Sequence, residues 1–190
     1  LFRSVNGLTH LLGAVLSFLG SVYLVHLAAV RGTIWHVVSF LVFGASLILL
    51  YLASGLYHSI SSPRTAQALH RMDHIMIYVL IAGTYTPICL VPLRGVWGWS
   101  LFGAAWGMAA AGIALKFTRV RFPRWLTVLP YVFLGWLCLV AIVPLVRTIP
   151  PGGLAWLAIG GLFYSVGAIV YTAKRPNPVL GVFGFHELWH

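Results

Sequence analysis

The last eight residues of the chain carry the residue types that most directly predict chemistry. They read Phe-Gly-Phe-His-Glu-Leu-Trp-His, and the two histidines, His186 and His190, are four residues apart. In a helix this spacing puts both imidazoles on one face, where they can reach one metal ion. Glu187 lies between them and is one of only two acidic residues in the chain, the other being Asp73. The spacing and the rarity of acidic residues together predict a metal site on this helix.

Three residues upstream could complete such a site. Imidazoles from His58, His186 and His190 would hold a zinc ion and leave its fourth position open for water, as catalytic zinc sites do. Zinc lowers the pKa of bound water toward about 7. Asp73 is then predicted to hold or deprotonate this water. Ser54, one helical turn before His58, is predicted to donate to a substrate oxyanion or to orient the same water.

These residues also have an interpretation without chemistry. A single histidine within a membrane more often forms a hydrogen bond between helices, and serine is common where helices touch. Among the remaining histidines, His10 competes for a place at the metal or beside a ligand, since ligating histidines usually need an orienting partner. His26 and His36 are expected near the outer membrane face, and His70 in a loop or at the start of a helix. His74 is expected to pack, because its side chain points about 100° away from that of the preceding aspartate.

The terminal pair also matches a second motif. His186-Glu187-Leu-Trp-His190 has the His-Glu-x-x-His pattern of the zinc-protease helix, in which the glutamate is the general base. The alternative is therefore an intramembrane metalloprotease that uses Glu187 in place of Asp73.

The elements that must position these residues are membrane-spanning helices. Hydrophobic residues make up 61% of the 190 residues and charged residues 7%, whereas soluble domains carry about 25% charged residues. Six runs of 20 to 32 residues contain no charged side chain. Each can cross a bilayer core of about 30 Å, which takes roughly 20 helical residues. We therefore predict an all-α integral membrane bundle of seven transmembrane helices, forming a single domain over residues 1–190.

The predicted helices follow the uncharged runs, with a seventh near the end. They cover about residues 6–30, 35–58, 69–90, 97–115, 125–146 and 154–173, and the seventh starts near Pro178. From Pro178 to His190 there are 13 residues, or about 20 Å of helix, which is too short to span. The chain also begins with leucine. We expect a fragment in which the last helix is incomplete.

The basic residues predict the orientation. Nine of the twelve lie at the N-terminus or in the connections after the second, fourth and sixth helices, and three lie in the other connections. This bias puts the N-terminus in the cytoplasm, and it explains the net charge of +10 without nucleic acid as a partner. Ser54, His58 and Asp73 then lie near the cytoplasmic ends of their helices, with His186 and His190 about 12 and 18 Å along the seventh. Cys89 and Cys138 form no spaced motif and predict no disulfide.

Four motifs, in order along the chain, carry a resemblance to a known family. They are Asn6-x-x-Thr9-His10-x-x-Gly13, Ser54-x-x-x-His58, Asp73 followed by Gly83-Thr-Tyr-Thr-Pro87, and His186-x-x-x-His190. Together they resemble the bacterial hemolysin III proteins, which belong with the progestin and adiponectin receptors and, more distantly, the alkaline ceramidases. The resemblance implies seven helices, a cytoplasmic N-terminus and a location in the bacterial inner (plasma) membrane. The departure is the last helix, which stops just past its second histidine.

The resemblance also implies a site and a reaction class. It implies that His58, His186 and His190 hold Zn2+, with Asp73 and Ser54 beside the zinc-bound water. Relatives hydrolyse the amide bond of ceramides or act as receptors. Three hypotheses follow: a zinc-dependent hydrolase of a lipid amide or ester, a receptor or sensor with structural zinc, and a pore-type lytic protein. The first is favoured, with a membrane lipid as its substrate.

Overall fold

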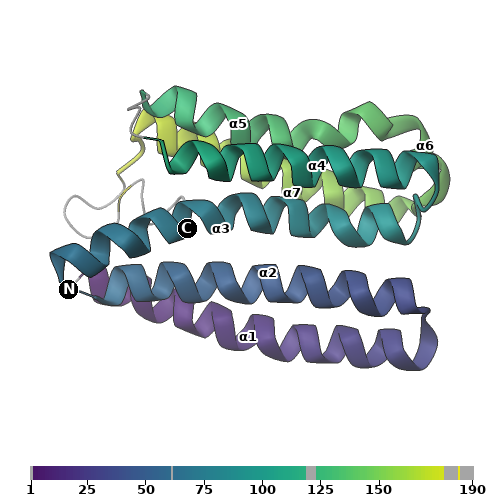
Figure 1. Cartoon of the computed structure of the whole chain (residues 1–190), viewed down its shortest axis with the longest axis horizontal. Helices are drawn as coiled ribbons and strands as arrows, with labels where there is room; N and C mark the ends of the chain where they lie inside the picture. Colours follow the sequence, from purple (N-terminus) through teal and green to yellow (C-terminus); the bar gives the residue numbers. More distant parts are fainter. Residues whose placement is uncertain (1, 61, 119–122, 178–183, 185–190) are drawn as a thin grey trace. The chain divides into compact units, whose positions relative to one another are not determined.

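The computed structural model describes residues 2–60, 62–118, 123–177 and 184. All regular secondary structure in these residues is helical, as predicted (Figure 1). The elements are α1 (Phe2–Arg31), α2 (Ile34–Ser59), α3 (Pro63–Leu90), α4 (Val96–Lys116), α5 (Arg124–Trp136), the 3-10 helix η1 (Leu137–Ala141), α6 (Ile142–Thr148) and α7 (Pro151–Ala173).

Six segments are long and apolar enough to cross a membrane. They are Asn6–Arg31, Ile34–Ser59, Thr65–Leu90, Val96–Lys116, Trp125–Thr148 and Pro151–Ala173. Six of the predicted spans are therefore found at their expected places. The seventh was expected from Pro178, and it falls outside the described residues, so the count of seven stays a prediction. The cytoplasmic N-terminus also stays a prediction.

The chain divides into two compact units, residues 3–118 and residues 119–190, and each is described by itself. In the first unit, α1, α2, α3 and α4 run back and forth beside one another (Figure 1). Small residues lie where the helices approach most closely. A Cβ atom on Gly13 of α1 would lie 2.7 Å from the Tyr51 ring of α2, and one on Gly83 of α3 would lie 2.8 Å from Ser46 Cβ of α2. Close contacts between small residues hold helices together in a bilayer. Lipid tails are as apolar as the helix surfaces, so no hydrophobic effect drives the helices together there.

The start of α3 differs from the sequence prediction. It was expected near Leu69, and it is at Pro63, with Ser62 as the N-cap residue. Proline suits the first helical turn, because the N–H that it lacks would have no partner there and its φ is already helical. Asp73 therefore lies ten residues into α3, about 15 Å from its start.

The fifth membrane span of the chain, which lies in the second unit, is not one continuous α-helix, so the prediction of a single helix there was wrong. It consists of α5, the 3-10 turn η1 and α6. Pro144 cannot donate to the carbonyl of Val140, and its ring crowds that carbonyl. The turn before it tightens into a 3-10 helix, which is a common solution for a strained segment. Trp136 Nε1 of α5 donates to Ser165 Oγ of α7 at 2.9 Å and joins the two helices.

Candidate functional site

Five polar side chains are buried near one end of α1, α2 and α3. Each has less than a tenth of its surface exposed: Asn6, His10, Ser54, His58 and Asp73. Polar and ionisable side chains within membrane spans are costly and mark functional sites by default. We call these five residues the polar group, and their positions along the three helices decide whether they lie close together.

Contacts between α1 and α2 give the register of this antiparallel pair. A Cβ atom on Gly7 would lie 2.6 Å from Ser59 Oγ, so these two residues are level. Moving three residues forward on α1 and three back on α2 places His10 level with Leu56. Leu56 lies midway between Ser54 and His58. His10 is therefore at the height of the predicted zinc ligand of α2.

The register of α2 and α3 follows in the same way from the contact between Ser46 and Gly83. Counting ten residues back along α3 from Gly83 reaches Asp73, and ten residues forward along α2 from Ser46 reaches Leu56. Asp73 is therefore at the same height as His10. The early start of α3 at Pro63 makes this possible, because the first turns of α3 extend past the end of α2 (Figure 1).

His10 and His58 lie close to each other across the α1–α2 contact. Their ring centroids are 5.9 Å apart, and the rings are tilted by 38°. Glycines allow this approach, since a Cβ atom on Gly55 would lie 3.2 Å from Leu11 Cδ2 and one on Gly7 would overlap the Ser59 hydroxyl. A second aromatic ring, that of Tyr51, lies 5.7 Å from the His10 ring.

Asp73 lies beside two further histidines of α3. His74 Nδ1 is 3.8 Å from Asp73 Oδ2, and it is also 2.9 Å from the carbonyl oxygen of His70. The His70 and His74 rings are 4.4 Å apart. His70 was expected in a loop or at the helix start, and it lies two turns inside α3 because the helix begins at Pro63. His74 was expected only to pack, and it instead brings a ring nitrogen near the Asp73 carboxylate.

Ser54 is the least exposed of the five, with 1% of its surface accessible. Its hydroxyl oxygen has no hydrogen-bond partner among the residues that the structure describes. A buried hydroxyl without a partner calls for an explanation, such as a water molecule or an ion. Imidazole, carboxylate and hydroxyl groups are also the groups found around zinc-activated water. The chemistry of these described side chains is therefore compatible with the predicted zinc site.

The remaining predicted ligands lie where the structure gives no description. His186, His190 and Glu187 are outside the described residues. Within residues 2–60, 62–118, 123–177 and 184, no three His, Cys, Asp or Glu side chains gather closely enough to hold a metal. The predicted zinc site would therefore need the terminal pair, and the roles of its residues stay predictions.

The other end of α2 carries His36, and it has a structural task. Its Nδ1 accepts a hydrogen bond from the backbone N–H of Thr33 at 3.1 Å, which caps the start of α2. This agrees with its expected place away from the polar group.

His10, which the sequence predicted as a competitor for the site, lies in the polar group, whereas Tyr51 was not among the predicted site residues. Tyr51 lies three residues before Ser54 and seven before His58, so all three share one side of α2. This helical spacing was the available signal. Nothing in the sequence reported the contact of Tyr51 with His10, because that contact depends on the register of α1.

Comparisons with known proteins agree with the architecture. The model of the family described as haemolysin-III related matches residues 3–190. The Hemolysin-3 homolog of Bacillus subtilis (strain 168) is 41% identical over 185 residues, which cover 97% of this chain and 84% of the relative. Hemolysin-3 of Bacillus cereus is 42% identical over 186 residues, covering 97% and 82%. The monocyte to macrophage differentiation factor of Homo sapiens is 25% identical over 198 residues, covering 99% and 76%. No solved structure matches the chain.

Proposed function

This chain belongs to the haemolysin-III-related family of integral membrane proteins, and from that premise we propose that it is a zinc-dependent hydrolase of a lipid amide. It is a multi-pass protein of the bacterial plasma membrane. The observation that carries the proposal is the common height of His10, Asp73 and the Ser54–His58 turn, since it gathers one candidate ligand, one acid and one hydroxyl donor at one level.

The zinc would be held by His58 together with His186 and His190. When bound, zinc supplies a Lewis acid that polarises a carbonyl and lowers the pKa of water. Ring nitrogens that ligate zinc are usually oriented by a neighbouring group. His10, whose ring centroid is 5.9 Å from that of His58, is the candidate for this task from the neighbouring helix α1.

Asp73 and Ser54 would act on the substrate. Asp73 accepts a proton from the attacking water and returns it to the amide nitrogen as the carbon–nitrogen bond breaks, which yields a fatty acid and an amine. The Ser54 hydroxyl donates to the carbonyl oxygen as negative charge develops there. A hydroxyl with no partner among the described residues is available for this without breaking another bond.

The test is zinc content and turnover on the purified full-length protein. We expect about one zinc per chain in the wild type, as a single three-histidine site requires, and loss of zinc in His58→Ala. His36→Ala is the matched control, because His36 lies on the same helix and only caps its other end. Ceramide is the substrate to assay, and Asp73→Asn should keep its zinc and lose about 10²- to 10⁴-fold in turnover.

The alternatives give different results. No zinc in a folded wild-type preparation that never met a chelator would overturn the site. Zinc in the wild type with no turnover of ceramide or phospholipid ester would instead favour a receptor or sensor. Release of haemoglobin from erythrocytes by the wild type and by Asp73→Asn alike would favour a lytic protein, which is what the name of the Bacillus cereus relative says of that protein.

A further inference from the structure

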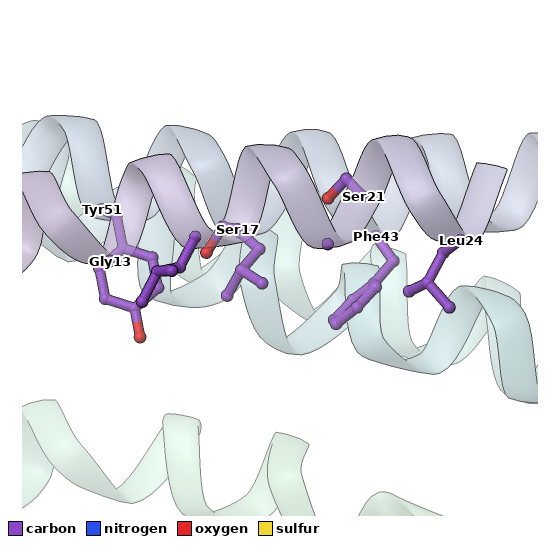
Figure 2. Close-up of a pocket in the computed structure, with 9 residues that line it drawn as sticks. Gly13, Ser17, Ser21, Leu24, Phe43 and Tyr51 are labelled. Carbon is purple, nitrogen blue, oxygen red and sulfur yellow. The ribbon is translucent and has the colours of Figure 1, made fainter. Parts of the chain in front are cut away.

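A pocket between α1 and α2, outside the polar group, has no place in the function so far. It has a volume of about 330 Å3. Its lining runs along α1 from Gly13, opposite Tyr51, to Leu24, near Phe43 (Figure 2). Apart from two serines and the Tyr51 hydroxyl, the lining side chains are apolar. We call it the α1/α2 pocket.

Gly20 keeps the α1/α2 pocket open. A Cβ atom on Gly20 would meet nothing within 4 Å among the described residues, whereas one on Gly13 would touch the Tyr51 ring. Close packing therefore explains Gly13 but not Gly20. The backbone at Gly20 is ordinary helix, where glycine is less stable than alanine. What glycine provides at this position is space.

The surroundings decide what can fill that space. Both walls belong to segments that are long and apolar enough to cross a membrane, so hydrocarbon is the medium expected around the α1/α2 pocket. Water is a poor occupant, since it needs two to four polar partners and the walls are mostly apolar. An empty pocket would lose dispersion contacts along its lining. The chemistry that matches the walls is a hydrocarbon chain.

One end of the α1/α2 pocket lies next to the polar group. Tyr51 lines the pocket and also contacts His10, with ring centroids 5.7 Å apart, and His10 contacts His58 at 5.9 Å. From Gly13 to Leu24 the pocket follows α1 for about 16 Å, close to the roughly 15 Å of one leaflet of hydrocarbon. A single acyl chain can therefore lie along it with its polar end at Tyr51.

We propose that the α1/α2 pocket holds the acyl chain of a membrane lipid, with the chain end near Leu24 and the polar end beside Tyr51 and His10. The identification of that polar end as the amide to be cleaved rests on the proposed function. Lipid tails are as apolar as the pocket walls, so the transfer of a chain from bilayer to pocket gains little from hydrophobic burial. The pocket fixes the direction and depth of the lipid rather than its affinity.

The test uses two photoreactive ceramides, one with a diazirine near the amide and one with a diazirine at the end of the acyl chain. Each is added to the full-length protein in vesicles of phosphatidylethanolamine and phosphatidylglycerol, and the labelled peptides are mapped by mass spectrometry. We expect the first probe to label around Gly13 and Tyr51 and the second around Leu24 and Phe43. Equal labelling of both ends by both probes would overturn the proposal.

A leucine at Gly20 should fill the α1/α2 pocket. Gly20→Leu is expected to lose the ordered labelling, while its zinc content stays that of the wild type. Gly103→Leu on α4 is the matched control, because a Cβ atom there also meets nothing within 4 Å. It should keep the ordered labelling. Labelling that persists in Gly20→Leu would overturn the proposal.

The results distinguish lipid from other occupants of the α1/α2 pocket, and they also distinguish failure of this proposal from failure of the proposed hydrolase function. A photoreactive amino acid placed at Leu16 should capture lipid. Capture of a second chain, or of residues 178–190 of the same chain, would overturn the proposal. Ordered labelling without zinc or turnover would leave the lipid pocket standing and reject the hydrolase, whereas zinc-dependent turnover without ordered labelling would reject the pocket alone.

Discussion

Replacing Ser54 by alanine should stabilise the zinc-free protein while it removes activity. The Ser54 side chain is buried, and its hydroxyl has no hydrogen-bond partner among the described residues. Leaving a buried polar group unsatisfied costs about 1–3 kcal/mol, and alanine removes that cost. For a chain of this length, ~1 kcal/mol shifts the midpoint of thermal unfolding by about 2–4 °C. We therefore expect Ser54→Ala to unfold at a temperature several degrees higher than the wild type.

Two serines of the same helix are matched controls. Ser39 and Ser46 are as buried as Ser54, and each hydroxyl donates to a backbone carbonyl, that of His36 at 3.1 Å and that of Phe43 at 2.7 Å. Alanine at these positions removes a hydrogen bond that contributes about 0.5–1.5 kcal/mol. Ser39→Ala and Ser46→Ala should therefore lower the unfolding temperature, in the opposite direction to Ser54→Ala.

The assay is thermal unfolding of each variant in one detergent, after removal of zinc, with ceramide turnover measured on the zinc-loaded protein. If Ser54 donates to the carbonyl oxygen, Ser54→Ala should lose about 10²- to 10³-fold in turnover. A loss of stability as large as that of Ser46→Ala would show that the Ser54 hydroxyl has a structural partner. The reasoning from its unsatisfied state would then be refuted.

Three further predictions concern the neighbours of the site and the packing that positions it. His10→Ala should weaken zinc binding by about 10- to 100-fold without abolishing it, as loss of an orienting group does. The affinity is measured by competition with a zinc-binding dye, and an unchanged affinity would remove His10 from the site. Chelation should lower the unfolding temperature of the wild type, and added zinc should restore it, because a ligand stabilises the state that binds it; His58→Ala should show neither shift. Gly112→Val should lower the free energy of unfolding by about 1–3 kcal/mol, because a Cβ atom at Gly112 would overlap the buried Tyr78 ring. Gly107→Val should lower it much less in the same denaturation assay, because a Cβ atom at Gly107 would have no atom within 4 Å among the described residues.

The membrane spans could be predicted from the sequence because the bilayer around them restricts which residues they can contain. A charged side chain is excluded from hydrocarbon, so runs without charge mark the helices almost directly. The boundaries of α2 and α4 were predicted to within one residue. The start of α3 was predicted near Leu69 and lies at Pro63, because proline is as suited to the first turn of a helix as it is harmful inside one.

The break in the fifth span shows the opposite error with the same residue type. Pro130 and Pro144 both fall inside the predicted helix, and only the second is preceded by a 3-10 segment. Pro130 lies in the second turn of α5, where the carbonyl that loses its partner is close to the start of the helix. Sequence alone gives the missing hydrogen bond at each proline, but the response of the backbone depends on the packing around it.

The grouping of the site residues could be predicted only in part, since it depends on register rather than on periodicity. Helical spacing puts Ser54 and His58 on one side of α2, and it cannot say which residues of α1 and α3 lie opposite them. That alignment is set elsewhere, by Gly7 against Ser59 and by Gly83 against Ser46. These small residues are common in membrane helices for general reasons, so their pairing is invisible in one sequence. The chemistry of the candidate site is therefore carried by the polar residues, whereas its geometry is carried by glycine and serine contacts, one of them about 15 Å away along α3.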